Sequence, residues 1–244
     1  MRSNIKAVLF DATDTLFTPN PSVGAVYARV AADFGIPLDA RAVDASFADD
    51  ARAVIYGLHT HGLAVWENES AARAFWRRLL DVIFLRLAQK TCPEACFQAI
   101  YQAFATAQAW RVFPDVIPAL DLLRRQNIRL GIVSNFDERL YRIVPALGLQ
   151  DYFRVVLPST EAGVAKPDRR IFLKALRRLN AEPSAALYVG NDPESDAAGA
   201  AAVGMRWLLV DRGGRLPAGE NVIRSFSEIP GRLGDLHSNR VPSL

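Results

Sequence analysis

The amino-acid sequence predicts an α/β protein with a doubly wound parallel sheet and an inserted all-helical domain. One short apolar run lies near the N-terminus, and from about residue 112 further runs alternate with helical patterns, which is typical of a parallel sheet. Over residues 18–111 the apolar spacing is helical and no strand-like run is convincing. With 244 residues the chain is long enough for one domain that carries a smaller one. We therefore expect a core domain of residues 1–17 and 112–244 and a helical domain of residues 18–111.

The composition is that of a globular protein. Half of the residues are apolar, 23% are charged and the formal net charge is +3. The Arg and Lys residues are dispersed, whereas a nucleic-acid interface gathers them on one face. No run approaches the roughly 18 consecutive apolar residues of a membrane helix, and the N-terminus lacks the long apolar core of a signal peptide. We expect a cytoplasmic protein, a monomer or homodimer, without nucleic-acid or membrane partners.

The first apolar run, residues 6–10, ends at Asp11, and a polar, turn-forming stretch follows up to Ser22. A short run of Val, Leu and Phe indicates a buried strand in a parallel sheet. Asp11 would then lie at the carboxyl end of this strand, where open α/β sheets bind their ligands. The alternative is that its carboxylate caps a following helix.

The inserted region contains only helical patterns. Its aromatic residues at helical spacing, such as Phe75 and Trp76, are expected in the core of this domain. Cys92 and Cys96 have no histidine nearby, so we expect ordinary thiols and not zinc ligands. Apolar spacing predicts helices over residues 23–34, 40–56, 70–89 and 93–107.

The remainder of the chain alternates between strands and helices. The last residues, 237–244, have too little apolar content to pack. Strands are predicted over residues 128–133, 154–157, 185–189 and 206–210, and helices over residues 118–126, 137–147, 168–179 and 196–202.

Polar residues follow three of these strands, as Asp11 follows the first. Because the carboxyl ends of parallel strands meet at one edge, we expect these residues to converge there. Each also has a structural alternative: Ser134 as a helix cap, Lys166 as a solvated loop residue, and Asp196 as a helix cap. The residues are Ser134 and Asn135, then Lys166, then Asn191, Asp192 and Asp196.

Four motifs carry these residues: F-D-x-x-x-T-L, V-S-N, K-P-D-x-x-I-F and V-G-N-D-x-x-x-D. In this order they resemble the haloacid dehalogenase-like hydrolase superfamily, in the branch with a helical cap inserted after the first strand of a Rossmann-like core. The likeness covers the chain except the interior of the cap. The first motif is similar to that of the group called haloacid dehalogenase-like hydrolase domain-containing protein 3, which also has Asp where most members have Gly.

The resemblance implies a Mg²⁺-dependent phosphatase that acts on a small phosphorylated metabolite through an aspartyl-phosphate at Asp11. Lys166 would neutralise charge on the nucleophile and the phosphoryl group, and Ser134 and Asn135 would hold the phosphoryl oxygens. Mg²⁺ prefers oxygen ligands. The implied ligands are Asp11, the main-chain carbonyl of Thr13, Asp192 and Asp196.

The sequence departs from the family pattern at Thr13, where most phosphatases have the Asp that serves as general acid and base. Because a threonine hydroxyl is not an acid near neutral pH, we expect slow turnover unless Asp14 substitutes for it. Asn191 likewise replaces a usual Asp. These departures leave two alternatives: a 2-haloacid dehalogenase, or a weakly catalytic binding or regulatory protein.

The cap would set the substrate preference, because a lid over the sheet edge excludes water and contacts the leaving group. The candidate contacts are the loop 56–62, Trp66, Trp110 and Arg111.

Overall fold

A computed structural model describes residues 5–60 and 65–235 of the protein. In this part of the chain, the main sheet has six parallel strands in the order β5-β4-β1-β6-β7-β8. This confirms the predicted parallel α/β core, although the two-residue strand β8 was not predicted. The strands are β1 (Ala7–Phe10), β4 (Arg129–Ser134), β5 (Val155–Pro158), β6 (Ala186–Gly190), β7 (Arg206–Val210) and β8 (Val222–Ile223).

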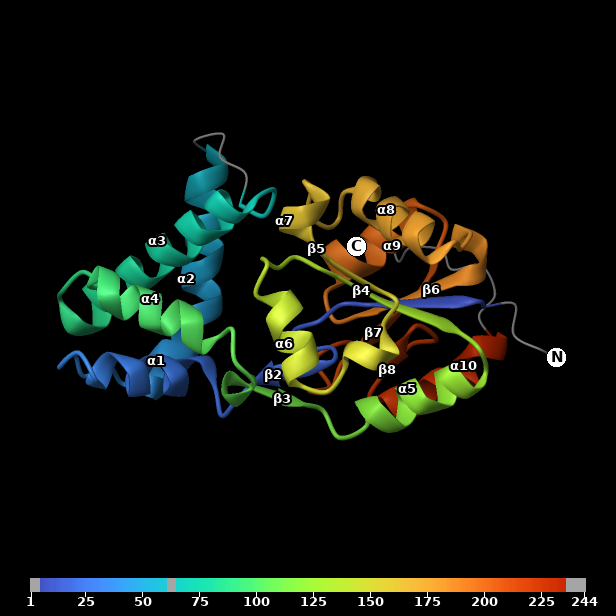
Figure 1. Ribbon diagram of the computed structural model, residues 1–244, viewed down its shortest axis with the longest axis horizontal. Helices are drawn as coiled ribbons and strands as arrows, with labels where there is room; N and C mark the ends of the chain where they lie inside the picture. The colour runs from blue at the N-terminus through green and yellow to red at the C-terminus, as the bar shows by residue number, and fades with distance from the viewer. Residues whose placement is uncertain (1–4, 61–64, 236–244) are drawn as a thin grey trace.

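Helices cover both faces of this sheet (Figure 1). Side chains of β1 alternate between the faces: Val8 and Phe10 belong to one buried cluster, and Ala7 and Leu9 to the other. Burial on both faces explains why the strand is a continuous apolar run. The first cluster includes residues of α5 (Val116–Arg125), α6 (Leu140–Ala146) and α10 (Ile229–Asp235), and the second includes residues of α8 (Arg169–Leu179) and α9 (Ala198–Ala202), with α7 (Ser159–Ala162) packed beside it.

Strand β1 lies at the point where the strand order reverses. It pairs with β4 on one side and with β6 on the other, and the chain crosses β1 between β5 and β6. Ligands of open α/β sheets bind outside the carboxyl ends of the strands at such a point. The predicted site residues that follow β1, β4 and β6 therefore start from three neighbouring strand ends.

The insert is helical, and Figure 1 shows it at one end of the sheet. Ser22 caps α1 by accepting a hydrogen bond from the Ala25 amide at 3.1 Å, and Asn68 caps α3 in the same way. Cys92 and Cys96 are buried free thiols. The helices are α1 (Val23–Ala32), α2 (Ala40–Thr60), α3 (Glu69–Ala88) and α4 (Glu94–Ala103).

Helix α2 corrects one prediction. It continues to Thr60, beyond the predicted end at residue 56, so the first part of the predicted loop 56–62 is helical. The rest of that loop lies outside the described residues, as does the predicted unpacked tail 237–244. None of the described helices is both long and apolar enough to cross a membrane.

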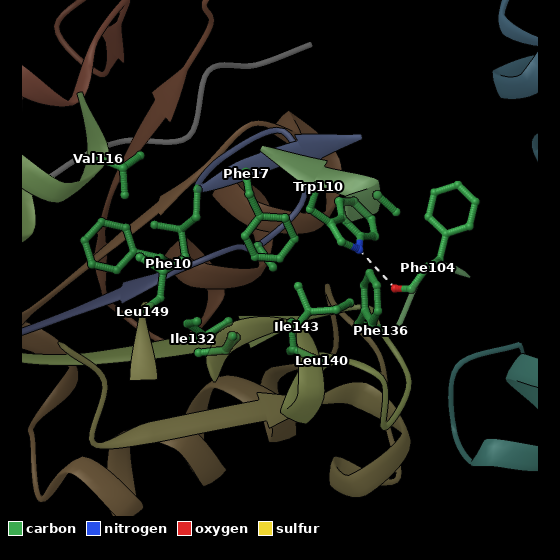
Figure 2. Packing of buried hydrophobic residues seen from close by; sticks show 14 of the residues in the cluster. Phe10, Phe17, Phe104, Trp110, Val116, Ile132, Phe136, Leu140, Ile143 and Leu149 are labelled. Atoms are coloured by element: carbon green, nitrogen blue, oxygen red, sulfur yellow. Dashed lines mark hydrogen bonds between the residues drawn. The ribbon is translucent and has the colours of Figure 1, made fainter. Parts of the chain in front are cut away.

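A small antiparallel ribbon joins the insert to the core. It consists of β2 (Phe17–Pro19) and β3 (Trp110–Val112), where the sequence predicted a turn and no strand. Trp110 packs edge-on against Phe17 with ring centroids 5.2 Å apart, and its indole nitrogen donates to the Phe104 carbonyl at 3.0 Å (Figure 2). The chain thus leaves and re-enters the core side by side.

Candidate active site

Four residues that are distant in the sequence meet at the carboxyl edge of the sheet. Asp11 follows β1, Ser134 ends β4, Lys166 lies between α7 and α8, and Asp196 lies beyond β6. The Ser134 hydroxyl donates to Asp11 Oδ1 at 2.9 Å. Lys166 Nζ lies 2.6 Å from Asp11 Oδ1 and 2.6 Å from Asp196 Oδ1. The structure therefore brings together these four of the predicted site residues.

Lys166 is shared between two carboxylates, and its side chain is only 2% exposed. Burial raises the pKa of Asp11 to about 6, with Lys166 opposing the shift and Asp196 adding to it. Burial lowers the pKa of Lys166, but Asp11 and Asp196 outweigh it and raise that pKa. The lysine is therefore protonated near neutral pH, and the fully ionised cluster carries one net negative charge.

The structural alternatives for Ser134 and Lys166 are wrong. Helix α6 begins at Leu140 with Arg139 at its N-cap position, so Ser134 does not cap it and instead contacts Asp11. Lys166 is buried in the cluster and is not a solvated loop residue. Asp11 is not a cap either, because a turn and β2 follow it instead of a helix.

The cap predicted for Asp196 is supplied by Asp192. A π-helical turn, Pro193–Ala197, precedes α9, and Asp192 Oδ1 accepts hydrogen bonds from the amides of Glu194 and Ser195 at 2.8 and 2.9 Å. Asp196 lies inside this turn. A Cβ atom on Gly190 would lie 2.2 Å from Asp196 Oδ2, so only glycine at this position allows the carboxylate to approach the strand.

Tyr188 is a member of the cluster that the sequence analysis missed. Its hydroxyl accepts a hydrogen bond from Lys166 Nζ at 3.0 Å. The same hydroxyl lies 2.9 Å from the Val133 carbonyl and 3.1 Å from Asp196 Oδ1, two acceptors for its one hydrogen. Burial raises its pKa well above the ordinary value. A tyrosine in an otherwise aliphatic strand was the available signal, because a buried hydroxyl needs a partner.

Asn135 positions the loop that carries Lys166. Its Oδ1 accepts from the Lys166 amide at 2.7 Å, and its Nδ2 donates to the Lys166 carbonyl at 3.0 Å. Both ends of the side-chain amide are therefore used by one main-chain residue. This pairing gives Asn135 a definite part in the site, different from the predicted contact with the phosphoryl group, which remains a prediction.

The predicted metal ligands do not form a carboxylate cage. In the described part of the chain, no group of three His, Cys, Asp or Glu residues is arranged to hold a metal. Asp196 Oδ1 contacts Lys166, and Asp196 Oδ2 accepts from the amides of Asn191 and Asp192 at 2.9 and 3.0 Å. Asp192 is exposed.

The remaining oxygens still suit Mg²⁺. The two side-chain hydrogen bonds that the described residues donate to the Asp11 carboxylate both end on Oδ1, so Oδ2 is open to a substrate. Asn191 Oδ1 lies 3.0 Å from the Thr15 hydroxyl, at the end of the Asp11 loop. Mg²⁺ commonly uses one or two carboxylates, several waters and the phosphate of a substrate. The donor set therefore fits this ion, with few protein ligands.

Thr13 and Asp14 have different surroundings. The Thr13 hydroxyl is buried and has no hydrogen-bond partner among the described residues. Asp14 is exposed, has a left-handed backbone with φ 61°, and accepts a hydrogen bond from the Thr18 hydroxyl at 2.7 Å. The position of Asp14 at the surface argues against its use as a general acid in the buried cluster.

A cavity of about 230 Å³ lies between the insert and the core. Trp66 and Trp110, both predicted contacts, line it, whereas Arg111 is exposed and is not part of the lining. Trp76, which was expected in the core of the insert, also lines the cavity. Its aromatic lining comprises Tyr27, Phe47, Trp66, Trp76, Phe97, Tyr101, Phe104, Trp110 and Phe136, and Thr13 and Asn135 contribute from the core.

The fold and the cluster define a Rossmann-like α/β protein with a helical insert and a buried Asp–Lys–Asp site at the switch point of its sheet. The profile of a family described as "Hydrolase: haloacid dehalogenase-like hydrolase" matches residues 5–204. The chain belongs to this family.

Three relatives illustrate the range of the family. Human haloacid dehalogenase-like hydrolase domain-containing protein 3 is 33% identical over 216 residues, which cover 86% of this chain and 83% of the relative. Glyceraldehyde 3-phosphate phosphatase of Methanopyrus kandleri is 34% identical over 138 residues, or 56% of this chain and 59% of the relative. The structure of 2-haloacid dehalogenase from Pseudomonas syringae is 27% identical with a TM-score of 0.66, covering 95% of this chain and 99% of that chain.

These similarities confirm the resemblance that the four motifs predicted. They include the likeness to haloacid dehalogenase-like hydrolase domain-containing protein 3. They also confirm that the protein is a haloacid dehalogenase-like hydrolase with an α/β core and a helical insert.

Proposed function

We propose that the protein is a Mg²⁺-dependent phosphatase that hydrolyses a small phosphorylated metabolite through an aspartyl-phosphate at Asp11. The observation that carries this proposal is the convergence of Ser134 and Lys166 on Asp11 Oδ1, at 2.9 and 2.6 Å. These contacts hold the carboxylate in place and leave Oδ2 to attack phosphorus. The similarity to a named phosphatase supports the same reaction class.

In this mechanism Asp11 Oδ2 forms a bond to phosphorus while the bond from phosphorus to the leaving oxygen breaks. Protonated Lys166 stabilises the charge that develops on the phosphoryl group, and the Ser134 hydroxyl, which donates to Asp11 in the structure, turns to donate to it. Water then attacks the aspartyl-phosphate, which releases phosphate and restores the carboxylate. The apolar cavity excludes bulk water from the leaving group.

A divalent cation is part of the proposal because the ionised cluster has one net negative charge and a phosphate monoester is also an anion. Asp11, the Thr13 carbonyl and the turn of residues 191–196, which includes Asp192 and Asp196, would hold Mg²⁺. When bound, the ion would neutralise the phosphoryl oxygens and lessen their repulsion from the nucleophile.

Thr13 makes the proposed enzyme slow. General acid–base catalysis is worth about 10²–10⁴ in rate, or roughly 3–5 kcal/mol of barrier. A hydroxyl at this position neither protonates the leaving alcohol nor activates the water. Asp14 does not take over this role, because its side chain lies at the surface. The aspartyl-phosphate is therefore expected to be long-lived.

The test is a screen of phosphorylated metabolites with Mg²⁺, run on the native protein, Asp11→Asn and Thr13→Asp. We expect Mg²⁺-dependent phosphate release that Asp11→Asn abolishes and Thr13→Asp increases by about 10². No release from any compound, together with no beryllofluoride adduct at Asp11, would refute the proposal. Without a gain in Thr13→Asp, the proposal of a weakly catalytic binding or regulatory protein is favoured instead.

The apolar cavity and Thr13 favour a second candidate, hydrolysis of a carbon–halogen bond by Asp11. A halide leaves as a stable anion and needs no proton from an acid, so Thr13 is no handicap in that reaction. Chloride release from 2-chloropropionate that a chelator does not affect would support this candidate over the phosphatase.

A further inference from the structure

The cavity between insert and core has the surface chemistry of a site for a flat, apolar group. Thr13 and Asn135 connect it to the Asp11 cluster, and rings such as Trp76, Tyr101 and Trp110 form its walls. Its volume of about 230 Å³ exceeds the roughly 150 Å³ of an engineered apolar cavity that binds benzene. A substituted aromatic ring therefore fits, and ring faces and edges are its preferred neighbours.

The charge in this lining is already neutralised. Arg139 is its charged residue, and its Nε and Nη2 donate to the two carboxylate oxygens of Asp137 at 2.8 and 2.6 Å. The guanidinium carbon also lies 3.8 Å from the centroid of the Tyr101 ring. Both members of the ion pair are buried. The described residues of the lining thus offer no free cation to a second anionic group of a substrate.

Among the described lining residues, the Thr13 hydroxyl is without a partner, but two larger polar side chains, Asn135 and Trp76, are already used. Both ends of the Asn135 amide are occupied by the main chain of Lys166, and the indole of Trp76 donates to Asp137 at 3.1 Å. A sugar or glycerol moiety would lose hydrogen bonds to water here without equivalent replacements, which costs free energy. The lining therefore discriminates against polyol phosphates.

Thr13 supplies an independent argument about the leaving oxygen. It borders the cavity and occupies the place of the general acid, so the leaving group receives no proton from this position. An alkoxide is a poor leaving group without a proton. A phenolic hydroxyl has a pKa of about 10, far below that of an alkyl alcohol, and departs as its anion.

From the cavity and Thr13 together, we infer that the site acts on aryl phosphate monoesters, an inference that rests on the proposed phosphatase function. The ring occupies the cavity and the phosphate faces Asp11. Asp11 Oδ2 forms a bond to phosphorus while the bond between phosphorus and the aryl oxygen breaks. The electron pair of that bond stays on the oxygen, so an aryloxide leaves. A water oxygen then bonds to phosphorus and one of the water's protons passes to solvent. The bond between phosphorus and Asp11 Oδ2 breaks, which releases phosphate and restores the Asp11 carboxylate.

Four phosphate esters separate the two parts of this inference: 4-nitrophenyl, phenyl, benzyl and glycerol phosphate. Benzyl phosphate keeps an aromatic ring but has an alkyl leaving oxygen. With Mg²⁺ and the native protein, we expect kcat/KM for phenyl phosphate to exceed that for benzyl phosphate by about 10², with similar KM values. The kcat/KM for 4-nitrophenyl phosphate should exceed that for phenyl phosphate. Glycerol phosphate should have the highest KM of the four esters.

Thr13→Asp tests the leaving-group argument directly. The new acid should raise kcat/KM for benzyl phosphate by about 10² but that for 4-nitrophenyl phosphate by less than about tenfold, because the latter needs little protonation. Equal gains for both esters would overturn the inference. If this variant does not fold, the native series with its leaving-group dependence decides alone.

Trp76→Leu tests the ring contacts. Removing one wall ring should raise KM for phenyl phosphate several-fold and leave KM for glycerol phosphate unchanged. Phe34→Leu is the matched control, since Phe34 is 39% exposed and lies outside the cavity lining, and it should change neither value. An unchanged KM for phenyl phosphate in Trp76→Leu would contradict the assigned ring position.

The outcomes also separate this inference from the proposed function. Hydrolysis of glycerol phosphate or benzyl phosphate as fast as phenyl phosphate overturns the aryl preference and leaves the phosphatase intact. A beryllofluoride adduct at Asp11 without turnover of any of the four esters also overturns it. No adduct and no phosphate release from any ester refutes the phosphatase itself.

Discussion

The hydroxyl of Tyr188, on β6, connects the reactive cluster to the main chain of β4, which lies on the other side of β1. It contacts Lys166 Nζ at 3.0 Å and the Val133 carbonyl at 2.9 Å. These contacts restrict Lys166 to the position from which it reaches Asp11. The residue thus acts through the lysine and is a positioning residue.

Tyr188→Phe should destabilise the protein by about 1–3 kcal/mol, because it leaves buried polar groups without one of their partners. Because Lys166 is less restricted without this hydroxyl, kcat/KM should also fall by about tenfold, which corresponds to roughly 1.4 kcal/mol of activation free energy. Urea unfolding and steady-state kinetics measure the two effects. Tyr141→Phe is the control: its hydroxyl also faces a main-chain carbonyl, Val156, but Tyr141 is 42% exposed, so a change within about 0.5 kcal/mol is expected. Equal losses in the two variants would contradict the role of Tyr188.

The sequence predicted the polar residues Asp11, Ser134 and Lys166 of the site, but it did not predict the part that Tyr188 and Trp76 take in it. Asp11, Ser134 and Lys166 were found because each is a polar residue directly after an apolar strand or in a recognisable motif. Tyr188 and Trp76 have large apolar rings, so their sequence pattern is the same whether they lie in the core or in the site. Their contacts depend on how distant elements pack, which no local pattern contains.

The segment between β4 and α6 contains a buried ion pair that joins the insert to the core. The side chains of Asp137 and Arg139 are 0% and 6% exposed. Asp137 Oδ2 also accepts from the Trp76 indole of α3 at 3.1 Å, and Arg139 Nη1 lies 3.4 Å from the Tyr101 carbonyl of α4. The pair therefore holds two helices of the insert against the core.

Asp137→Ala should destabilise the protein by about 3–5 kcal/mol, because it leaves the Arg139 charge buried without its partner. Urea unfolding measures this loss. Asp168→Asn is a control with the same spacing, since Asp168 pairs with Arg170 two residues on, at side-chain exposures of 35% and 72%. Asparagine keeps the helix-capping ability of Asp168, so a loss of at most about 1 kcal/mol is expected. A comparably small loss of unfolding free energy for Asp137→Ala would contradict the stabilising role of the buried ion pair.

The long elements were predictable and the short ones were not. Strand β4 and helix α8 have enough residues for their apolar periods to be read. Strands β2 and β3 have three residues each, and β2 ends in a proline that favours a turn prediction. Their pairing is stabilised by Trp110 on Phe17, a contact between residues on opposite sides of the insert. Tertiary packing therefore decides these strands.

Asp115 links the start of α5 to the C-terminal part of the core. Its Oδ2 accepts hydrogen bonds from Arg212 at 2.7 Å and from the hydroxyl of Ser225 and the amide of Phe226 at 2.8 Å each. Burial raises the pKa of Asp115, but these hydrogen bonds outweigh it and hold the pKa below the ordinary value of 3.8.

This lowered pKa predicts a pH dependence. The unfolded chain binds the proton at about pH 3.8 and the folded protein only below it, so Asp115 stabilises the fold above pH 3.8 and loses this effect as pH falls further. The difference in unfolding free energy between native protein and Asp115→Asn should be full at pH 6 and smaller at pH 3. Ile117→Ala, an exposed and non-titrating change on the same helix, should show no such trend. A difference that grows toward pH 3 would contradict the assignment.

Because Lys166 is buried, the rate at which its amine is acylated can report how often the fold opens at this residue. The sequence contains four lysines, and Lys6 and Lys90 are exposed, Lys174 is half-buried and Lys166 is buried. An amine-acylating reagent should modify the first three in the native protein, whereas Lys166 should react only through opening of the fold. Peptide mass spectrometry during a urea titration would measure the free energy of that opening at the nucleophile itself. Rapid acylation of Lys166 in native buffer would show that the cluster is open to solvent.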